Sequence, residues 1–276
     1  MKTAALLAHP AGHSGSPAMH NAAFKALGMD AHYEAWDVPP EELEDALQRL
    51  REPNILGANV SLPHKHAVLD GADAVQEDAR TIGAANVLVK RDGQLEARNS
   101  DAVGFLRSLA EAGVVARDAH AVVLGAGGAA HAVVHALRRA GARQVDIINR
   151  TASKTDALVA RVGGRKAGWE SLDPREVNVW VNTTTVGMNG AAGEGESPIP
   201  EGLLQAAPTH ATVVDIVYAP RVTPLLAAAR SAGLNTVDGT GMLVHQGAVA
   251  FEWWTGKEAP VAVMREALDA FLEGAS

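Results

Sequence analysis

Apolar runs and amphipathic segments alternate along the first hundred residues. Short apolar runs bounded by turn residues are typical of buried strands, whereas apolar positions three and four apart are typical of helices. Asp92-Gly93, between the last two runs, favours a tight hairpin turn, and Pro39-Pro40 is a typical helix start. The pattern predicts strands at residues 4–8, 31–38, 55–62, 86–89 and 94–98, and helices at 17–27, 41–50 and 75–82.

The same alternation resumes near residue 120. Strands that alternate with helices in this way are typical of βαβ units and of a mostly parallel sheet. After this series come two further helical segments, at residues 242–254 and 261–272. Within the series, the pattern predicts strands at 121–124, 144–148, 177–182, 213–217 and 236–237, and helices at 129–140, 154–162 and 223–232.

The break between the two series falls at residues 101–113, a helical segment with no strand partner of its own. A chain of 276 residues is long for one domain and comfortable for two. We therefore predict an α/β protein of two domains, with a hinge at this segment. Residues 188–200 are rich in Gly and Pro and are expected to form a long surface loop.

Composition and charge narrow the classes of function. The chain is 47% hydrophobic and 20% charged, which is typical of a globular protein. Its net charge of −8 disfavours a general surface for nucleic acid or anionic membranes. The apolar stretch at 121–137 is interrupted by Gly and His, and the first apolar run stops at His9-Pro10, so neither a membrane span nor a signal peptide is expected. Cysteine is absent, which excludes disulfides and thiol chemistry and fits a cytoplasmic location.

A glycine-rich loop separates the predicted strand at 121–124 from the helix that follows. Its pattern is Gly125-x-Gly127-x-x-Ala130, in the strand-to-helix context that the dinucleotide fingerprint requires. Glycine lets the backbone approach a pyrophosphate, and the helix N-terminus supplies free N–H groups and a favourable dipole. The pattern indicates cofactor binding, and the alternative is a tight turn that serves packing alone.

The end of the next strand bears on which dinucleotide binds. An NAD site usually has an acidic residue about 20 residues after the glycine loop. Here Asn149 and Arg150 stand in that place, with Lys154 one helical turn further on. Because cations oppose the dipole of a helix N-terminus, a nearby 2′-phosphate explains them better than solvated surface positions do. The sequence therefore favours NADP.

Several short motifs are spread over nearly the whole chain. His13-Ser14-Gly15-Ser16-Pro17 has the form H-S-x-S-P, and residues 59–65, NVSLPHK, have the form N-V-T-x-P-x-K with Ser61 in place of threonine. The others are Gly83-Ala84-Ala85-Asn86, Asn99-Ser100-Asp101-Ala102-Val103-Gly104, the glycine loop, Asn149-Arg150-Thr151 and residues 238–246, DGTGMLVHQ. Together these motifs resemble those of the shikimate dehydrogenase family.

The resemblance implies the reversible reduction of 3-dehydroshikimate to shikimate with NADPH, a step of chorismate and aromatic amino-acid biosynthesis. It also implies an N-terminal α/β substrate domain, a Rossmann-type doubly wound NADP domain, and last helices that return to the N-terminal domain. The expected bounds are residues 1–101 with 239–276 for the first domain and residues 102–238 for the second.

The family's site residues carry over where the motifs match. Lys65 would work with Asp101 at the reacting oxygen. The substrate residues would be Ser14 and Ser16 at the carboxylate, Tyr218 near it, and Ser61, Asn86, Asp101 and Gln246 at the ring hydroxyls. The cofactor residues would be Gly125, Ala126, Gly127, Gly128, Ala129, Asn149, Arg150, Thr151, Lys154, Thr183, Ile216 and Gly239.

The chemistry of such a substrate fits these residue types. Shikimate carries a carboxylate and hydroxyls on little apolar surface, so its site needs many short polar side chains. Ser and Asn are also ordinary turn and cap residues, so no single one of them indicates a substrate site. Their concentration at the ends of apolar segments is what favours such a site. Reduction of a ketone creates an alkoxide, and an ammonium such as that of Lys65 can supply its proton. Without that role, Lys65 would be a surface residue just past a strand.

Three positions depart from the family pattern. Ser61 replaces threonine, so the hydroxyl stays but a methyl is lost. Lys154 stands where many NADP-using members have arginine, so bidentate phosphate binding is lost. Thr240 replaces the commoner leucine near the nicotinamide end.

Three other functions stay open at this point. Quinate or dual quinate/shikimate dehydrogenases often use NAD and have an acid where Arg150 stands here. Methylenetetrahydrofolate dehydrogenases share the two-domain plan, but the H-S-x-S-P and N-S-D segments disfavour them. A non-catalytic sensor that binds shikimate-like ligands would have no need of both Lys65 and Asp101.

Histidine pairs and partners complete the expectations. His131 and His135 are four residues apart on one predicted helix, but no acid lies near them in sequence, so no metal site is expected. His64 and His66, which flank Lys65, are expected to be solvent-exposed. The expected partner is a small-molecule substrate, with neither nucleic acid nor membrane, and a homodimer is left open.

Overall fold

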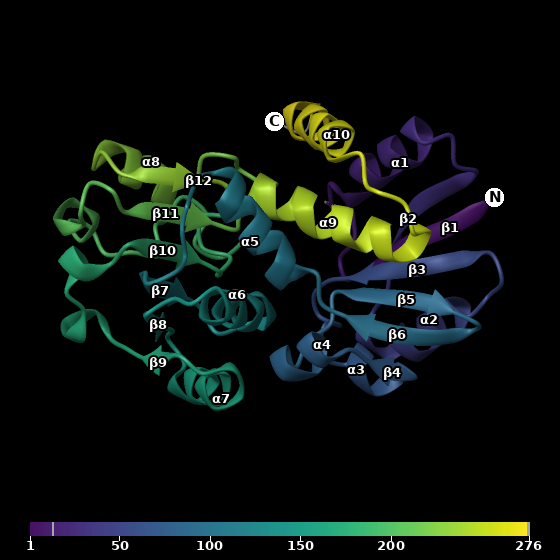
Figure 1. Ribbon diagram of the computed structural model, residues 1–276, viewed down its shortest axis with the longest axis horizontal. Coiled ribbons are helices and arrows are strands. Elements are labelled where there is room, and N and C mark those ends of the chain that lie inside the picture. Colours follow the sequence, from purple (N-terminus) through teal and green to yellow (C-terminus); the bar gives the residue numbers. More distant parts are fainter. Residues whose placement is uncertain (13, 275–276) are drawn as a thin grey trace. The chain divides into compact units, whose positions relative to one another are not determined.

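The computed structural model describes residues 1–12 and 14–274. Contacts divide the chain into two units, one formed by residues 1–104 and 244–276 and the other by residues 105–243. The divisions fall inside two helices, α5 (Asp101–Glu111) and α9 (Gly239–Thr255). Each unit holds one six-stranded sheet (Figure 1). Within the described residues, no helix is both long enough and apolar enough to cross a membrane.

The first unit is built on a mixed sheet with the strand order β2-β1-β3-β5-β6-β4. β1 runs parallel to β2 and β3, whereas β5 runs antiparallel to β3 and β6. After its first residue, every position of β1 is buried, as expected for a strand covered on both faces. The strands are β1 (Lys2–Ala8), β2 (Ala31–Asp37), β3 (Ile55–Val60), β4 (Ala74–Val75), β5 (Val87–Arg91) and β6 (Gln94–Arg98).

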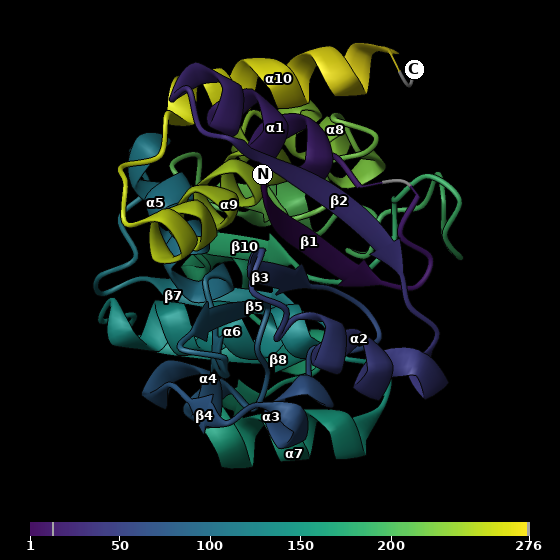
Figure 2. The same ribbon diagram turned by 90° about the vertical axis from the view of Figure 1, so that its right-hand side faces the viewer.

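Helices from both ends of the chain complete the first unit. α10 packs so closely on α1 that a Cβ on Gly15 would lie 2.5 Å from Leu268 Cδ1, and both ribbon views show the two helices side by side (Figure 2). The ring N–H of Trp254, on α9, donates to the carbonyl oxygen of Leu88 at 3.0 Å. The predicted return of the last helices to the N-terminal unit is therefore confirmed. The helices are α1 (Ser16–Ala26), η1 (Pro40–Glu42), α2 (Leu43–Arg49), α3 (Val68–Gly71), α4 (Glu77–Ile82) and α10 (Val261–Gly274).

The second unit has a parallel sheet with the strand order β12-β11-β10-β7-β8-β9. The chain builds outward from β7 to β9 and then returns to build from β10 to β12. This is a doubly wound sheet, in which ligands bind at the carboxyl ends of the strands where the order reverses. The predicted α/β class with a Rossmann-type unit is confirmed. The elements are β7 (His120–Leu124), α6 (Gly128–Arg139), β8 (Gln144–Ile148), α7 (Ala152–Val162), β9 (Arg165–Lys166), η2 (Trp169–Ser171), η3 (Pro174–Glu176), β10 (Val179–Asn182), η4 (Leu204–Ala206), β11 (Thr212–Asp215), α8 (Pro224–Ser231) and β12 (Asn235–Val237).

Most predicted elements are present, but several differ in their bounds and some were not predicted. The strand expected at 55–62 ends at Val60, and the chain then turns. The helix expected at 75–82 begins at Glu77, because residues 74–75 pair with β6 as the short strand β4. β9 was not predicted. The hairpin between β5 and β6 is confirmed: Asp92 (φ 51°) and Gly93 (φ 79°) both take the positive φ that a two-residue hairpin turn requires.

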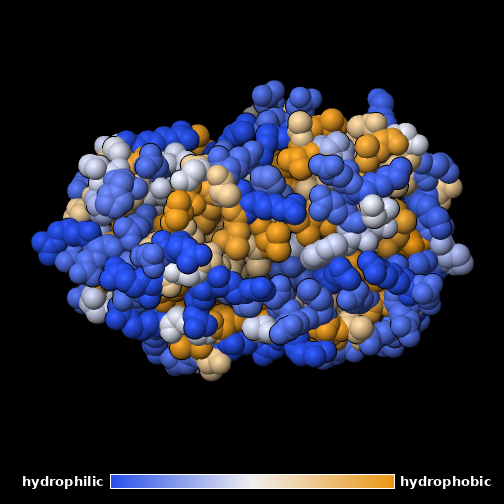
Figure 3. Space-filling model, viewed as in Figure 1, coloured by the Kyte–Doolittle hydropathy of each residue, from blue (hydrophilic) through white to orange (hydrophobic). Residues whose placement is uncertain are grey.

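Hydrophilic residues occupy most of the face seen in Figure 3. Among the described residues, large apolar side chains left exposed include Leu62, Met188 and Val222. Each of these three lies on a loop that follows a strand, rather than on the strand itself. Most apolar side chains of the strands are instead buried in the cores of the two units.

Candidate active site

The turn after β3 holds Lys65 in a fixed place in the first unit. The N–H of Ser61 donates to the carbonyl oxygen of Leu7 at 2.9 Å, so the turn starts in contact with β1. The N–H of Ala85 donates to the carbonyl oxygen of Lys65 at 2.8 Å, which ties the turn to the segment before β5. The backbone position of Lys65 is therefore fixed by a hydrogen bond to its own carbonyl oxygen.

The two histidines beside Lys65 act as further anchors. The ring of His64 donates to the carbonyl oxygen of Val38 at 2.7 Å, and the ring of His66 donates to that of Gly83 at 2.7 Å. His66 is exposed, but His64 is buried. The expectation that both are solvent-exposed is therefore wrong for His64, because a backbone carbonyl inside the unit satisfies its ring.

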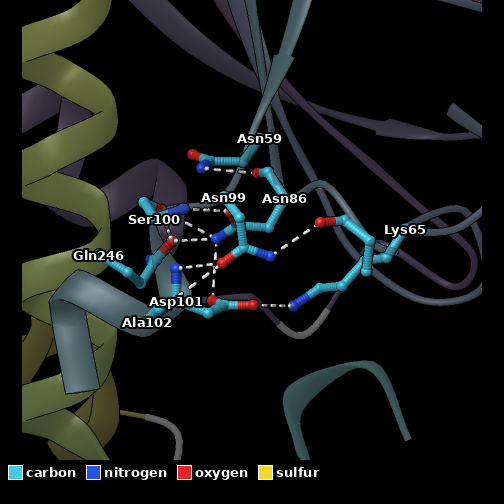
Figure 4. Close-up of polar contacts among 9 residues, drawn as sticks. Asn59, Lys65, Asn86, Asn99, Ser100, Asp101, Ala102 and Gln246 are labelled. Atoms are coloured by element: carbon cyan, nitrogen blue, oxygen red, sulfur yellow. Dashed lines mark hydrogen bonds and ion pairs between the residues drawn. The ribbon is translucent and has the colours of Figure 1, made fainter. Parts of the chain in front are cut away.

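Lys65 and Asp101 form a close ion pair (Figure 4). Lys65 Nζ lies 2.6 Å from Asp101 Oδ2, and the two side chains are only 15% and 7% exposed. Asp101 is the first residue of α5, and Asn99 caps this helix by accepting the N–H of Asp101 at 3.0 Å. The side-chain N–H of Asn99 donates to the carbonyl oxygen of Ala84 at 2.9 Å. The capped helix start thus fixes the carboxylate that receives the lysine.

Asn86 joins this ion pair to the rest of the cluster. Its Nδ2 donates to Asp101 Oδ1 at 2.8 Å and to Ser100 Oγ at 2.9 Å, and Gln246 Oε1 lies 3.3 Å away. Its Oδ1 accepts the N–H of Ser100 at 2.7 Å. An amide nitrogen has two protons for these three acceptors, so the contact with Gln246 is the weakest. The structure therefore brings together four predicted residues, Lys65, Asn86, Asp101 and Gln246, and adds Ser100, which the sequence analysis did not assign.

The serines of the H-S-x-S-P motif lie at the start of α1, and its His13 lies outside the described residues. The N–H of Ser16 donates to Ser14 Oγ at 3.2 Å. Ser16 is buried, and burial raises the pKa of Tyr33 well above its ordinary value. The Tyr33 hydroxyl donates to Asn59 Oδ1 at 2.9 Å, and Asn59 Nδ2 donates to the Asn86 carbonyl oxygen at 3.4 Å. A hydrogen-bonded chain thus connects Tyr33 to the Lys65 cluster. Ser61 lies in the turn with Lys65.

In the second unit, the glycine loop has the geometry that its pattern predicts. Gly125 has φ +107°, and a Cβ there would lie 2.7 Å from Thr183 Oγ1, so no other residue fits without strain. Thr183 is held by its hydroxyl, which donates to the Leu124 carbonyl oxygen at 2.6 Å. Gly127, which precedes α6, has nothing within 4 Å of a Cβ position. The backbone at the start of α6 is therefore open to a pyrophosphate.

The cations after β8 stand at the start of α7. Asn149 Nδ2 donates to the Thr151 carbonyl oxygen at 2.9 Å, which turns the chain into the helix. Arg150, Thr151 and Lys154 are exposed. Neither Arg150 nor Lys154 forms an ion pair with another described residue. Two unpaired cations at a helix N-terminus leave a place where an anion would be stabilised.

The remaining cofactor candidates follow β11 and β12. A Cβ on Gly239 would lie 2.3 Å from the Ile216 carbonyl oxygen, so glycine is required where α9 begins. Tyr218 is three residues past the end of β11, in the second unit. Because the strands are parallel, Gly125, Asn149, Thr183 and Ile216 all follow the carboxyl ends of their strands, the edge at which ligands bind in such sheets.

Three family models match the chain in succession. They are described as the shikimate dehydrogenase substrate binding domain (residues 6–88), shikimate / quinate 5-dehydrogenase (residues 108–239) and the shikimate 5′-dehydrogenase C-terminal domain (residues 239–268). The matches cover both units and the Lys65 turn. They therefore agree with the resemblance drawn from the short motifs.

Similar proteins span the full length. A relative from Symbiobacterium thermophilum, named shikimate dehydrogenase (NADP(+)), is 47% identical over 281 residues, 98% of this chain and 94% of its own. The crystal structure of shikimate 5-dehydrogenase from Thermus thermophilus in complex with NADP(H) and shikimate has a TM-score of 0.90 and 40% identity, covering 99% of this chain and 100% of its own. A ligand-free 5-ketofructose reductase of Gluconobacter sp. has a TM-score of 0.88 and 34% identity, covering 98% of both chains. On these similarities, together with the motifs and the geometry above, the chain belongs to the shikimate dehydrogenase family.

Proposed function

We propose that this protein catalyses the reversible, NADPH-dependent reduction of 3-dehydroshikimate to shikimate. The observation that carries the proposal is the Lys65–Asp101 pair, 2.6 Å apart and set among Asn86, Ser100 and Gln246. A cluster of this kind offers an ammonium, a carboxylate and amides to one polar substrate. The relatives' names support the same reaction.

The chemistry assigned to this cluster is proton transfer. NADPH, when bound, supplies the hydride that reduces the ketone carbon. The ketone oxygen then carries the negative charge, and the Lys65 ammonium gives it a proton and is left as a neutral amine. In the reverse direction the amine takes the hydroxyl proton back. Asp101 holds the lysine at 2.6 Å and can accept a hydrogen bond from the same hydroxyl.

On the substrate side, we assign the ring hydroxyls to Ser61, Asn86 and Gln246, with Asp101. Gln246 Oε1 has the two longest contacts in the cluster, 3.3 Å to Asn86 Nδ2 and 3.5 Å to Ser100 Oγ, so it can exchange them for a ligand hydroxyl at low cost. Ser14 and Ser16 are assigned to the carboxylate, and Tyr218 is assigned near it. Ser14 Oγ accepts the N–H of Ser16 at 3.2 Å, and its hydroxyl proton can be donated to a carboxylate.

On the cofactor side, the residues present fit NADP. The open backbone at residues 125–129 would hold the pyrophosphate, with Thr183, Ile216 and Gly239 further along the same edge of the sheet. Asn149, Thr151 and the exposed cations Arg150 and Lys154 would hold the 2′-phosphate end. Asn149 and Arg150 occupy the place of the acid that binds the ribose of NAD. The preference proposed is therefore for NADP over NAD.

The two units divide these tasks. We assign proton transfer and every proposed substrate residue except Tyr218 to the unit of residues 1–104 and 244–276, and cofactor binding to residues 105–243. The sequence led us to expect slightly different bounds, which lie three and five residues before these divisions. They are residues 1–101 with 239–276 for the first unit and residues 102–238 for the second. A cytoplasmic location and a homodimer stay predictions.

The test is a substrate panel with a matched inactive variant. The absorbance of NADPH is followed with shikimate and NADP, and that of NADH with quinate and NAD. It is also followed with NADPH and either 3-dehydroshikimate or 5-ketofructose. Lys65→Met serves as the control for each activity. Turnover of shikimate with NADP above the other pairs is expected. Faster turnover of quinate with NAD would favour the quinate enzyme instead, and shikimate binding without turnover would favour a sensor.

A further inference from the structure

Two fully buried polar side chains pair at the carboxyl ends of β10 and β11. Asn182 is the last residue of β10 and Asp215 the last of β11, and they are direct partners in the register of the two strands. Asn182 Nδ2 donates to Asp215 Oδ1 at 2.9 Å. Both side chains have 0% exposure, so neither can contact a ligand in this arrangement. The mechanism described above makes no use of them.

Asp215 fixes the loop that follows β11. Its Oδ1 also accepts the N–H of Val217 at 3.0 Å, and its Oδ2 accepts the hydroxyl of Thr223 at 2.7 Å. Thr223 is the residue that caps α8. The carboxylate therefore bonds the start and the end of residues 216–223, the loop that carries Ile216 and Tyr218. Burial raises the pKa of Asp215 to about 6, against the opposing effect of these donors.

Asn182 fixes the loop that follows β10 in the same way, through hydrogen bonds of its side chain. Its Oδ1 accepts the N–H of Thr184 at 3.0 Å and the Thr184 hydroxyl at 2.7 Å, and its Nδ2 donates to the Val186 carbonyl oxygen at 3.2 Å. This loop carries Thr183, which lies against Gly125. The two loops also meet each other, because the N–H of Asn189 donates to the Ala219 carbonyl oxygen at 3.1 Å.

The position of this pair in the sheet points to one half of the cofactor. A dinucleotide lies across the point where the strand order reverses, with its pyrophosphate at the helix after the first strand. Arg150 and Lys154, after β8, favour the 2′-phosphate of the adenosine half on that side of β7. The nicotinamide half then lies on the other side, over β10 and β11. Ile216 and Gly239, whose backbones meet there, are on that side.

We propose that Asp215, together with Asn182, is a positioning residue that holds the loops at residues 183–187 and 216–223 in the arrangement required by the nicotinamide half of the cofactor and by Tyr218. The inference rests on the proposed function, which it deepens. The competing account is that the pair only stabilises the fold. If the pair positions the loops, a variant changes the binding and turnover constants of the folded protein. If the pair only stabilises the fold, a variant changes only the free energy of unfolding.

The same sheet offers a matched control. Asp146, in the middle of β8, is also fully buried and accepts hydrogen bonds from His120 at 2.9 Å and from Arg165 at 2.8 Å. His120 begins β7 and Arg165 begins β9. Asp146→Asn therefore perturbs a buried carboxylate away from the loops at the carboxyl edge. It tests fold stability without touching the proposed site.

The experiment compares Asp215→Asn with Asp146→Asn, and Thr223→Val with Thr223→Ser. For each variant we would measure urea unfolding, the NADPH dissociation constant by fluorescence without substrate, and kcat and KM for NADP and shikimate. Asp215→Asn and Thr223→Val are expected to raise the NADPH dissociation constant about tenfold and to lower kcat by up to about 100-fold, the scale of a misplaced reactive group. Thr223→Ser, which keeps the hydroxyl, should restore both constants. Asp146→Asn should lower only the free energy of unfolding.

The possible results separate the two claims. If Asp215→Asn changes only the unfolding transition, as Asp146→Asn does, the positioning role is overturned. If Asp215→Asn does not fold, the Thr223 pair decides, because equal constants for Thr223→Val and Thr223→Ser would also overturn it. If the wild type does not turn over shikimate with NADP, the proposed function fails. A rise in the NADPH dissociation constant confined to the Asp215 and Thr223→Val variants would then still support the positioning role.

Discussion

Breaking the Lys65–Asp101 pair should affect stability and turnover in different ways. At 2.6 Å and an effective dielectric constant of about 20, the attraction between the charges is about 6 kcal/mol before desolvation is subtracted. Because both side chains are mostly buried, removing one partner leaves an uncompensated buried charge. Loss of one partner of such a pair typically costs about 3–5 kcal/mol. We expect Lys65→Met and Asp101→Asn each to lower the free energy of unfolding by about that amount.

The double variant Lys65→Met/Asp101→Asn removes both charges at once. It should be at least as stable as either single variant, because no buried charge is left unpaired. Turnover should not recover. A general acid or base typically contributes about 10²–10⁴-fold, and groups that act as a unit are non-additive. The kcat of the double variant should therefore be close to that of the worse single variant.

The assay combines urea unfolding of the four proteins with calorimetric binding of shikimate and measurement of kcat. Lys166→Met is the control for stability, because Lys166 and Asp156 form an equally direct pair, 2.9 Å, with both side chains about half exposed or more. An exposed pair of this kind contributes about 1 kcal/mol or less. Near wild-type kcat in the Lys65→Met variant would refute proton transfer by Lys65. A rate loss explained wholly by lost shikimate binding would reduce Lys65 to a binding residue.

Three further predictions follow from the described contacts. Arg150→Ala should raise the KM for NADP about tenfold or more, the worth of a charge-assisted contact, and leave the KM for NAD unchanged. Equal loss for both cofactors would contradict the 2′-phosphate assignment. Lys166→Ala is the control. Gly125→Ala should destabilise the fold by about 1–3 kcal/mol, because it combines φ +107° with a Cβ 2.7 Å from Thr183 Oγ1. Gly127→Ala should instead unfold like the wild type and lose NADPH affinity. An unchanged NADPH affinity of this second variant would show that no pyrophosphate approaches Gly127. His20 is fully buried, which lowers its pKa to about 3 from 6.5, so its neutral form stabilises the fold above pH 6.5 and this stability is lost as the pH falls toward 3. That loss is about 3 kcal/mol between about pH 7 and about pH 4, and His20→Phe should remove it from urea unfolding curves; the same pH dependence in the variant would place it elsewhere.

Local patterns suffice for much of the fold and of the site. The strands of the second unit read as apolar runs because a doubly wound sheet buries both of its faces. Lys65, Asn86 and Asp101 could be grouped from the sequence because each stands in a short motif that resembles one of the family's, and the structure joins them with Gln246 through hydrogen bonds. The tight turn at Asp92-Gly93 depends on residues adjacent in the chain, so its signal is local.

What the sequence could not supply depends on contacts between distant residues. β4 and β9 are two residues long, too short for any periodicity. His64 lies in a polar turn, and its burial follows from a carbonyl 26 residues away, at Val38. Asn182 and Asp215 are each an ordinary polar residue at a strand end, and only the register of β10 with β11 makes them partners.

The division of the chain also bears on how it folds during synthesis. The first unit is interrupted by residues 105–243 and needs residues 244–276 to be complete, since Phe251 is buried in it and Trp254 bonds Leu88. At about 5–20 residues per second, the ribosome takes roughly 7–30 s to make the intervening segment. Throughout that time the nascent N-terminal sheet lacks α10 and most of α9, which complete its unit, while the inserted unit can close its own core once it is made. The nascent chain therefore presents unburied apolar surface for many seconds, which makes the half-made protein a substrate for chaperones and a point of aggregation risk.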